Sequence, residues 1–218
     1  MSCHKSNIIS FATLFQKNIQ FAYYVDVTVY AVDCDKTSMD RARTNIATAE
    51  AEQRIKKGFN NALIIRMLYN IIMILSGQVV AQCCLAHEAD IPPGGVDMVL
   101  IWIALHDMHN PTTVLETARK ILAPDGCVLV LEFTNPDNFS EVATGATEDG
   151  EKLRPLTKFC LSVSVLHCLP VSKTIDPSQA IGTSISLATI QKIAARAGFN
   201  NVSVFPANET MSMYVLRL

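Results

Sequence analysis

The sequence contains few glycines, and none of them lies near the N-terminus. Only 9 of the 218 residues are glycine, and the first is Gly58. A nucleotide-binding loop of the G-x-G-x-x-G type needs glycines where the backbone turns tightly and approaches the ligand. The stretch before Gly58 therefore excludes such a loop. This absence argues against a nicotinamide-dependent dehydrogenase, which requires it.

The chain also lacks a strong charge of either sign. Its 18 Lys and Arg are balanced by 20 Asp and Glu, for a formal net charge of −2. Proteins that bind nucleic acid through phosphate contacts usually present a basic patch or stripe. The sequence gives no such indication, so we expect no nucleic-acid partner.

Zinc-type cysteine spacing and a membrane-spanning run are missing as well. The 7 cysteines form no C-x-x-C pair, which excludes the common structural zinc motifs. His106, His109 and a cysteine match no standard ligand set, so we expect no metal. We interpret the cysteines as small buried side chains in a reducing compartment, the cytoplasm. The apolar run 62–86 is interrupted by Arg66 and three amide residues, so we expect no membrane span.

What the sequence does contain is an apolar strand that ends in an acid. Val27 to Val32 is β-branched and aromatic, Asp33 follows it, and a helical pattern begins at Ser38. A carboxylate at the end of a strand in a nucleotide-binding α/β fold accepts hydrogen bonds from ribose hydroxyls. The pattern therefore predicts a nucleoside-binding fold.

The remainder of the chain alternates helical and extended patterns. Ser10 to Phe21 is compatible with a short helix, and a long helix is expected over residues 38–57. Alternation of this kind favours a mostly parallel sheet. Further strands are predicted at 96–103, 127–133, 202–205 and 211–216, and further helices from Asn110-Pro111, over 156–169 and over 186–197.

These pieces together resemble a class I S-adenosylmethionine-dependent methyltransferase over most of the chain. Such enzymes have a Rossmann-like α/β sheet that is mostly parallel, with an antiparallel C-terminal strand pair. The resemblance rests on segments in the family's order: Val29–Asp33, Ala89–Pro92 with Val96–Leu100, Leu122–Val130 and Ala197–Phe199.

Three further segments resemble a small-molecule subgroup that usually carries an N-terminal winged-helix-like region, often used for dimerisation. They are Ala104–Asp107, Leu166–Ser172 and Ile181–Thr183. The winged-helix-like region and the family's D-x-G-x-G-x-G loop are not found in the sequence. We predict a single methyltransferase-like domain over 1–218, with the first strand missing, a divergent or truncated N-terminus at 1–26 and an apolar insert at 62–82.

The resemblance implies a binding site for S-adenosylmethionine. Asp33 would bind the ribose, although capping of the following helix is the alternative. Met39 would pack on the cofactor, or equally in the core. The loop from His87 through Asp90 would flank the adenine, although a solvated acidic loop is the simpler interpretation. The predicted cofactor-binding residues are Asp33, Cys34, Met39, His87, Glu88, Asp90 and Trp102.

His106 and Asp107 follow the predicted strand 96–103, at an edge where ligands bind in open α/β sheets. A histidine beside a carboxylate can accept a proton from an attacking hydroxyl or amine. These two residues are the predicted catalytic pair, and hydrogen bonding within the turn is their structural alternative.

The leading hypothesis is methyl transfer from S-adenosylmethionine to a small-molecule acceptor, with a homodimer left open. The alternative is a catalytically inactive methyltransferase-like protein that acts through protein association. A lost first strand and the apolar insert would expose sheet edge or apolar surface, and such surface favours association.

Overall fold

A computed structural model gives the fold of the chain. Structure is described for residues 6–12, 27–51, 62–63, 78–135, 155–183, 185–208 and 210–218.

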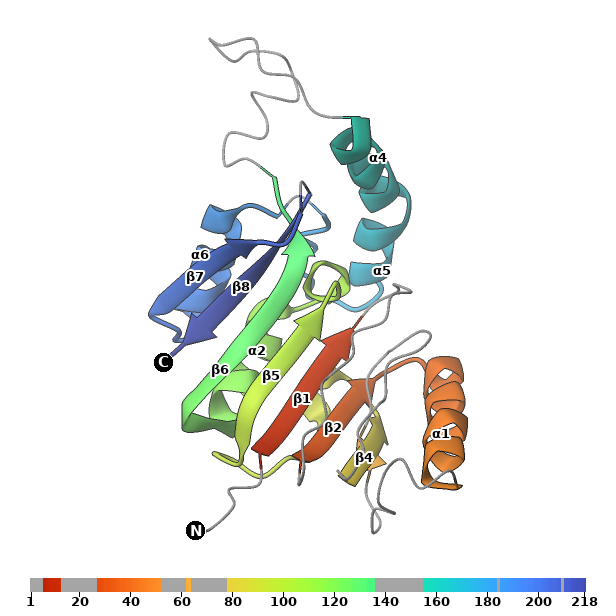
Figure 1. The fold of residues 1–218 in the computed structure, drawn as a ribbon. Helices are drawn as coiled ribbons and strands as arrows, with labels where there is room; N and C mark the ends of the chain where they lie inside the picture. The colour runs from red at the N-terminus through yellow and green to blue at the C-terminus, as the bar shows by residue number, and fades with distance from the viewer. Residues whose placement is uncertain are drawn as a thin grey trace, which may run out of the picture.

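One eight-stranded sheet organises these residues, in the order β3-β4-β2-β1-β5-β6-β8-β7 (Figure 1). Neighbouring strands from β3 through β4, β2, β1 and β5 to β6 pair in parallel, and β8 is antiparallel to both β6 and β7. The strands are β1 (Ser6–Ala12), β2 (Val27–Asp33), β3 (Ala62–Leu63), β4 (Gln78–Cys83), β5 (Val96–Trp102), β6 (Leu122–Phe133), β7 (Asn201–Pro206) and β8 (Met211–Arg217). The predicted parallel sheet with an antiparallel C-terminal pair is confirmed.

The prediction that the first strand is missing is wrong. β1 lies between β2 and β5, pairing Ile8 with Val29 on one side and with Met98 on the other. The expected helix over residues 10–21 also conflicts with β1, which extends to Ala12. Two parallel neighbours satisfy the backbone of this short segment, so tertiary pairing overrides its weak local pattern.

Helix α2 (Pro111–Ile121) connects β5 to β6 and begins as its sequence predicts. The Asn110 side chain accepts a hydrogen bond from the Thr113 N–H, and Pro111 occupies the first turn. Asparagine is a preferred N-cap residue, and proline costs no hydrogen bond at this position. The apolar face of the helix is buried against the sheet, with Val114, Leu115 and Ala118 in the core.

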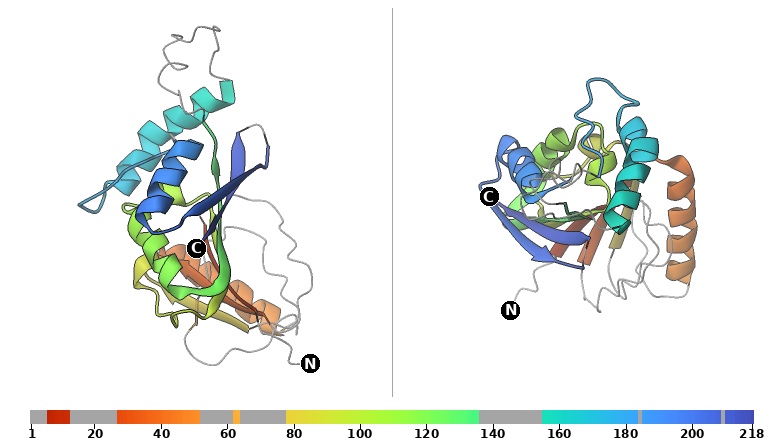
Figure 2. Two further views of the ribbon diagram at one scale, coloured as in Figure 1. Left: turned by 90° about the vertical axis from the view of Figure 1, so that its left-hand side faces the viewer. Right: turned by 90° about the horizontal axis from the view of Figure 1, so that it is seen from above.

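The C-terminal helices follow the predicted ranges. α4 (Pro155–Val163) continues through the π-helix η3 (Ser164–Cys168) into α5 (Leu169–Ser172). α6 (Leu187–Arg196) is capped by Ser186 and is followed by Gly198, whose φ is +86°. Helices α2 and α6 lie side by side on one face of the sheet (Figure 2).

The N-terminal helix α1 (Lys36–Ala51) lies against β2 and β4, and its exposed surface carries ion pairs of Asp40 with Lys36 and Arg43. The segment predicted as an apolar insert ends in β4, which pairs in parallel with β2. Among the described residues, no helix is long and apolar enough to cross a membrane.

Candidate functional site

The parallel strands end together along one edge of the sheet. Trp102 at the end of β5 pairs with Ala12 of β1 and with Leu131 of β6. Asp33 at the end of β2 pairs with Cys83 of β4. Because the carboxyl ends of parallel strands form the ligand-binding edge of open α/β sheets, the segments that follow them are the candidate site.

A strained residue marks the exit of the chain from β5. Ile103 has a φ of +47°, and its N–H donates to the Leu131 carbonyl at 2.8 Å. A β-branched residue in the left-handed region is an outlier that the surrounding structure must hold in place, and such strain concentrates at functional sites. The turn leads directly into the 3-10 helix η2 (Leu105–Asp107), which carries both predicted catalytic residues.

The central residue of the site is His106, which is only 4% exposed. Its Nδ1 lies 2.8 Å from Oε2 and 3.0 Å from Oε1 of Glu132, a side chain of β6 with no exposed surface. The backbone N–H of His106 donates to the same carboxylate at 3.2 Å, and the Phe133 N–H donates to it at 3.3 Å. Glu132 therefore holds both the backbone and the ring of His106 and leaves Nε2 as the nitrogen that faces Asp107.

Several groups act on the pKa of His106. Burial has the largest single effect and lowers it, but the charge of Glu132, hydrogen bonds from the ring to Cys168 and Glu132, and the charge of Asp107 together outweigh burial. The pKa of His106 is consequently held well above its ordinary value.

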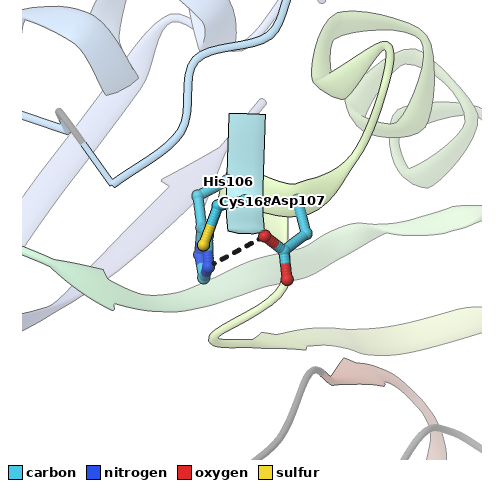
Figure 3. A group of neighbouring side chains, drawn as sticks. All are labelled: His106, Asp107 and Cys168. Atoms are coloured by element: carbon cyan, nitrogen blue, oxygen red, sulfur yellow. Dashed lines mark ion pairs between the residues drawn. The ribbon is translucent and has the colours of Figure 1, made fainter. Parts of the chain in front are cut away.

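Asp107 and Cys168 also lie beside this ring. Asp107 Oδ1 is 3.3 Å from His106 Nε2, close enough for an ion pair. This oxygen is nevertheless buried without a hydrogen-bond partner among the described residues. The Cys168 sulfur comes from the π-helix η3 and lies against the His106 ring (Figure 3). The two predicted catalytic residues are thus brought together, with a thiol that was not predicted.

The residues predicted to bind the cofactor are placed along the same edge but do not form one cluster. Asp33 ends β2, and Cys34 is exposed in the turn that follows. Met39 is 0% exposed on α1, as a core residue would be. Trp102 is half-buried at the end of β5.

The loop after β4 contains the remaining predicted residues. Its 3-10 helix η1 (Ala86–Glu88) is held by a hydrogen bond from the Leu85 N–H to Glu88 Oε2 at 3.3 Å. The half-buried His87 ring meets the His109 ring edge-on at 5.5 Å, which ties this loop to the turn after η2. Asp90 is exposed. The loop therefore borders the His106 region.

A scan against known families matches the chain to the methyltransferase domain over residues 11–204. The chain belongs to the methyltransferase domain family. No curated protein matches the sequence.

Solved structures of methyltransferases share the fold. The S-adenosylmethionine-dependent methyltransferase SibL, in its apo form, is 18% identical, with a TM-score of 0.51 over 88% of this chain and 43% of its own. The mitomycin 7-O-methyltransferase MmcR is 15% identical, with a TM-score of 0.50 over 88% of this chain and 42% of its own. The chain thus spans less than half the length of these methyltransferases.

Two residues of this methyltransferase domain were missed from the sequence. Glu132 lies within an apolar strand, where a lone acid requires a buried partner, and that requirement was the available indication. Cys168 had no such indication, because only the folded chain brings its sulfur close to His106, 62 residues before it in the sequence.

Proposed function

We propose that this chain transfers a methyl group from S-adenosylmethionine to a small-molecule acceptor that loses a proton in the reaction. The observation that carries the proposal is the buried His106, which Glu132 orients at the carboxyl edge of a methyltransferase-domain sheet. When a hydroxyl or amine of the substrate attacks the methyl group, a nearby base must accept its proton, and imidazole is the side chain best suited to that task.

The residues along the edge fit the chemistry of the cofactor. Asp33 offers a carboxylate at a strand end, where ribose hydroxyls are bound in this class of sheet. The loop carrying His87, Glu88 and Asp90 would border the adenine, and Trp102 would lie beneath it. When bound, S-adenosylmethionine supplies an electrophilic methyl group. Contacts of Cys34 and Met39 with the cofactor stay predictions.

His106 performs the proton-accepting step in this proposal. Glu132 holds Nδ1–H, so the lone pair of neutral His106 is on Nε2, facing Asp107. As the acceptor attacks, its proton passes to Nε2, and Glu132 stabilises the imidazolium that forms. Asp107 is a positioning residue in this scheme, since it flanks the ring.

The test is a transfer assay with S-adenosylmethionine labelled in its methyl group and a panel of phenols, amines and thiols. We expect labelled product from one chemical class and its loss in His106→Gln. An exposed histidine of the same region, His167, provides the matched control His167→Gln. Labelled product that is undiminished in His106→Gln would contradict the assigned role.

Association without catalysis is a second candidate function, favoured by an apolar surface on the α4–η3 segment. Phe159, Val163 and Leu166 are exposed at helical spacing, Leu166 at 81%. Exposed apolar stripes of this kind mark protein-interaction surfaces. A homodimer that Leu166→Lys dissociates, in a chain that binds no cofactor, would select this function. The earlier basis for it, a missing first strand, no longer applies because β1 is present. A cytoplasmic location also stays a prediction.

A further inference from the structure

The strongest unassigned feature is a set of potential metal ligands around His106. Within the described part of the chain, His106, Asp107 and Cys168 offer a nitrogen, an oxygen and a sulfur that all lie within 4.8 Å of one another (Figure 3). We propose that this cluster binds Zn²⁺ and that bound zinc inhibits methyl transfer. The binding stands on the geometry alone, whereas the inhibition rests on the proposed function.

The tautomer of His106 is already arranged for a metal. Glu132 accepts from Nδ1 at 2.8 Å, which directs the lone pair of the neutral ring to Nε2. Histidine ligands of zinc almost always donate their other nitrogen to a carboxylate or carbonyl in this way, because it fixes the ring and strengthens the ligand. Glu132 would serve as that outer carboxylate.

The spacing of the first two ligand atoms fits tetrahedral zinc. Zinc–nitrogen and zinc–oxygen bonds of about 2.1 Å at a tetrahedral angle place the two ligand atoms about 3.4 Å apart. His106 Nε2 and Asp107 Oδ1 lie 3.3 Å apart. This separation is longer than that of a good charge-assisted hydrogen bond, about 2.8 Å.

Asp107 supplies a second, independent indication of a ligand. Its side chain is 10% exposed, and its buried Oδ1 has no hydrogen-bond partner among the described residues. Burying a carboxylate oxygen without a hydrogen-bond partner costs free energy, and a site for an ion that the oxygen would bind is one of the established explanations for such an atom. The atom points toward His106, on the side where Cys168 lies (Figure 3).

Cys168 makes the site selective for a thiophilic cation. Its sulfur is delivered by the π-helix η3, and π-helical turns occur frequently at functional sites. Nitrogen, sulfur and carboxylate oxygen together suit Zn²⁺, whereas Mg²⁺ and Ca²⁺ prefer oxygen alone. Three protein ligands would leave a fourth position for water.

Zinc at this position blocks the step assigned to His106. Coordination uses the Nε2 lone pair, so Nε2 can no longer accept a proton from the acceptor. Zinc binding releases into solvent any proton that its ligand atoms carry. Removal of zinc by a chelator frees His106 and Cys168 again, so His106 can again accept a proton.

The first test measures metal binding without reference to activity. Co²⁺ added to the purified, metal-free chain should give a thiolate-to-cobalt charge-transfer band, and Zn²⁺ should abolish the band at one equivalent. Cys168→Ser should remove the band, and Asp107→Asn should weaken Zn²⁺ binding by more than about tenfold. The matched control is Cys127→Ser, a half-buried cysteine on β6. A band that persists in Cys168→Ser, or no band in the wild-type chain, would overturn the site.

The second test separates this inference from the proposed function. Zinc should inhibit wild-type transfer reversibly, and the inhibitory concentration should rise more than about tenfold in Asp107→Asn. Cobalt binding through Cys168 in a chain that transfers no methyl group would refute the proposed function and leave the metal site standing. Transfer that saturating zinc does not inhibit would refute the inhibition.

Discussion

The proposed acceptor side of the site, around His106, and its proposed cofactor side are built in different ways. On the acceptor side, a histidine and two carboxylates from η2 and β6 are buried in contact with one another. On the cofactor side, the candidate residues are spread over β2, α1, the loop after β4 and the end of β5, and Cys34, Glu88 and Asp90 are exposed.

In the proposed function the two sides have separate roles, and this difference in construction is consistent with them. The acceptor side is preorganised, because Glu132 fixes the ring of His106 before any ligand arrives. The cofactor side depends on how strand-end groups and flanking loops meet the ligand, and the sequence before Gly58 offers no glycine for that contact. We therefore expect variants on one side to change catalysis and variants on the other to change cofactor affinity.

The largest effect should come from His106→Ala. We expect the turnover number to fall by about 10²- to 10⁴-fold, the usual contribution of a positioned proton acceptor. Affinity for S-adenosylhomocysteine, measured by calorimetry, should stay unchanged. A matching loss of affinity would show that the two sides are not separate.

The next largest effect should come from Glu132→Gln, which keeps the shape of the side chain and removes its charge. Because Glu132 raises the pKa of His106, the variant should lower that pKa. A proton acceptor must be neutral, so the rising limb of kcat/KM against pH should move to lower pH. A limb that does not move would exclude His106 as the group that titrates.

The same pair predicts how stability depends on pH. The pKa of His106 is raised in the folded state, so protonation of His106 stabilises the fold. This stabilisation is fully present below the ordinary histidine pKa of about 6.5. The stabilisation is lost as pH rises through the folded-state pKa. The unfolding temperature of the wild-type chain should therefore fall as pH rises from about 6.5 through that pKa, and the fall should be smaller in Glu132→Gln. Thermal unfolding over a series of pH values measures this dependence.

A smaller shift is expected from Asp107→Asn. The charge of Asp107 contributes least among the groups that raise the pKa of His106. The kcat/KM limb should therefore move in the same direction as for Glu132→Gln, but less. A larger shift than that of Glu132→Gln would reverse the assigned order of the two carboxylates.

The smallest effect concerns stability away from the site. Ser186→Ala removes the N-cap of α6, where the Ser186 hydroxyl accepts from the Thr189 N–H at 3.3 Å, and should cost about 1 kcal/mol in unfolding free energy. Asp40→Ala on the cofactor side removes only exposed ion pairs and should cost less. Urea unfolding compares them, and equal losses would contradict this ranking.

Much of the C-terminal fold could be predicted because its local patterns and its packing agree. Asn110 and Pro111 mark the start of α2, and Gly198 adopts the positive φ expected after a helix. β1 could not be predicted in the same way. Ser6–Ala12 is a strand because β2 and β5 pair with it, and pairing partners distant in the sequence leave no local pattern.

The candidate site also has a part that local sequence patterns predict and a part that only the folded sheet brings together. His106 and Asp107 were predicted because they follow a recognisable buried strand. Their partner Glu132 is 26 residues away, on the neighbouring strand. The pair meets only because β5 and β6 are adjacent and in register at their ends, as Trp102 opposite Leu131 shows. That register is a property of the folded sheet.

The measurement that tests the account most directly is calorimetric titration of the chain with S-adenosylhomocysteine, alongside Asp33→Ala and the surface control Asp40→Ala. We predict binding in the wild-type chain and the control, and a loss of about tenfold or more in Asp33→Ala, the cost of removing hydrogen bonds to a charged group. No heat of binding from the folded wild-type chain would contradict methyl transfer, and equal affinity in Asp33→Ala would contradict the placement of the cofactor at the end of β2.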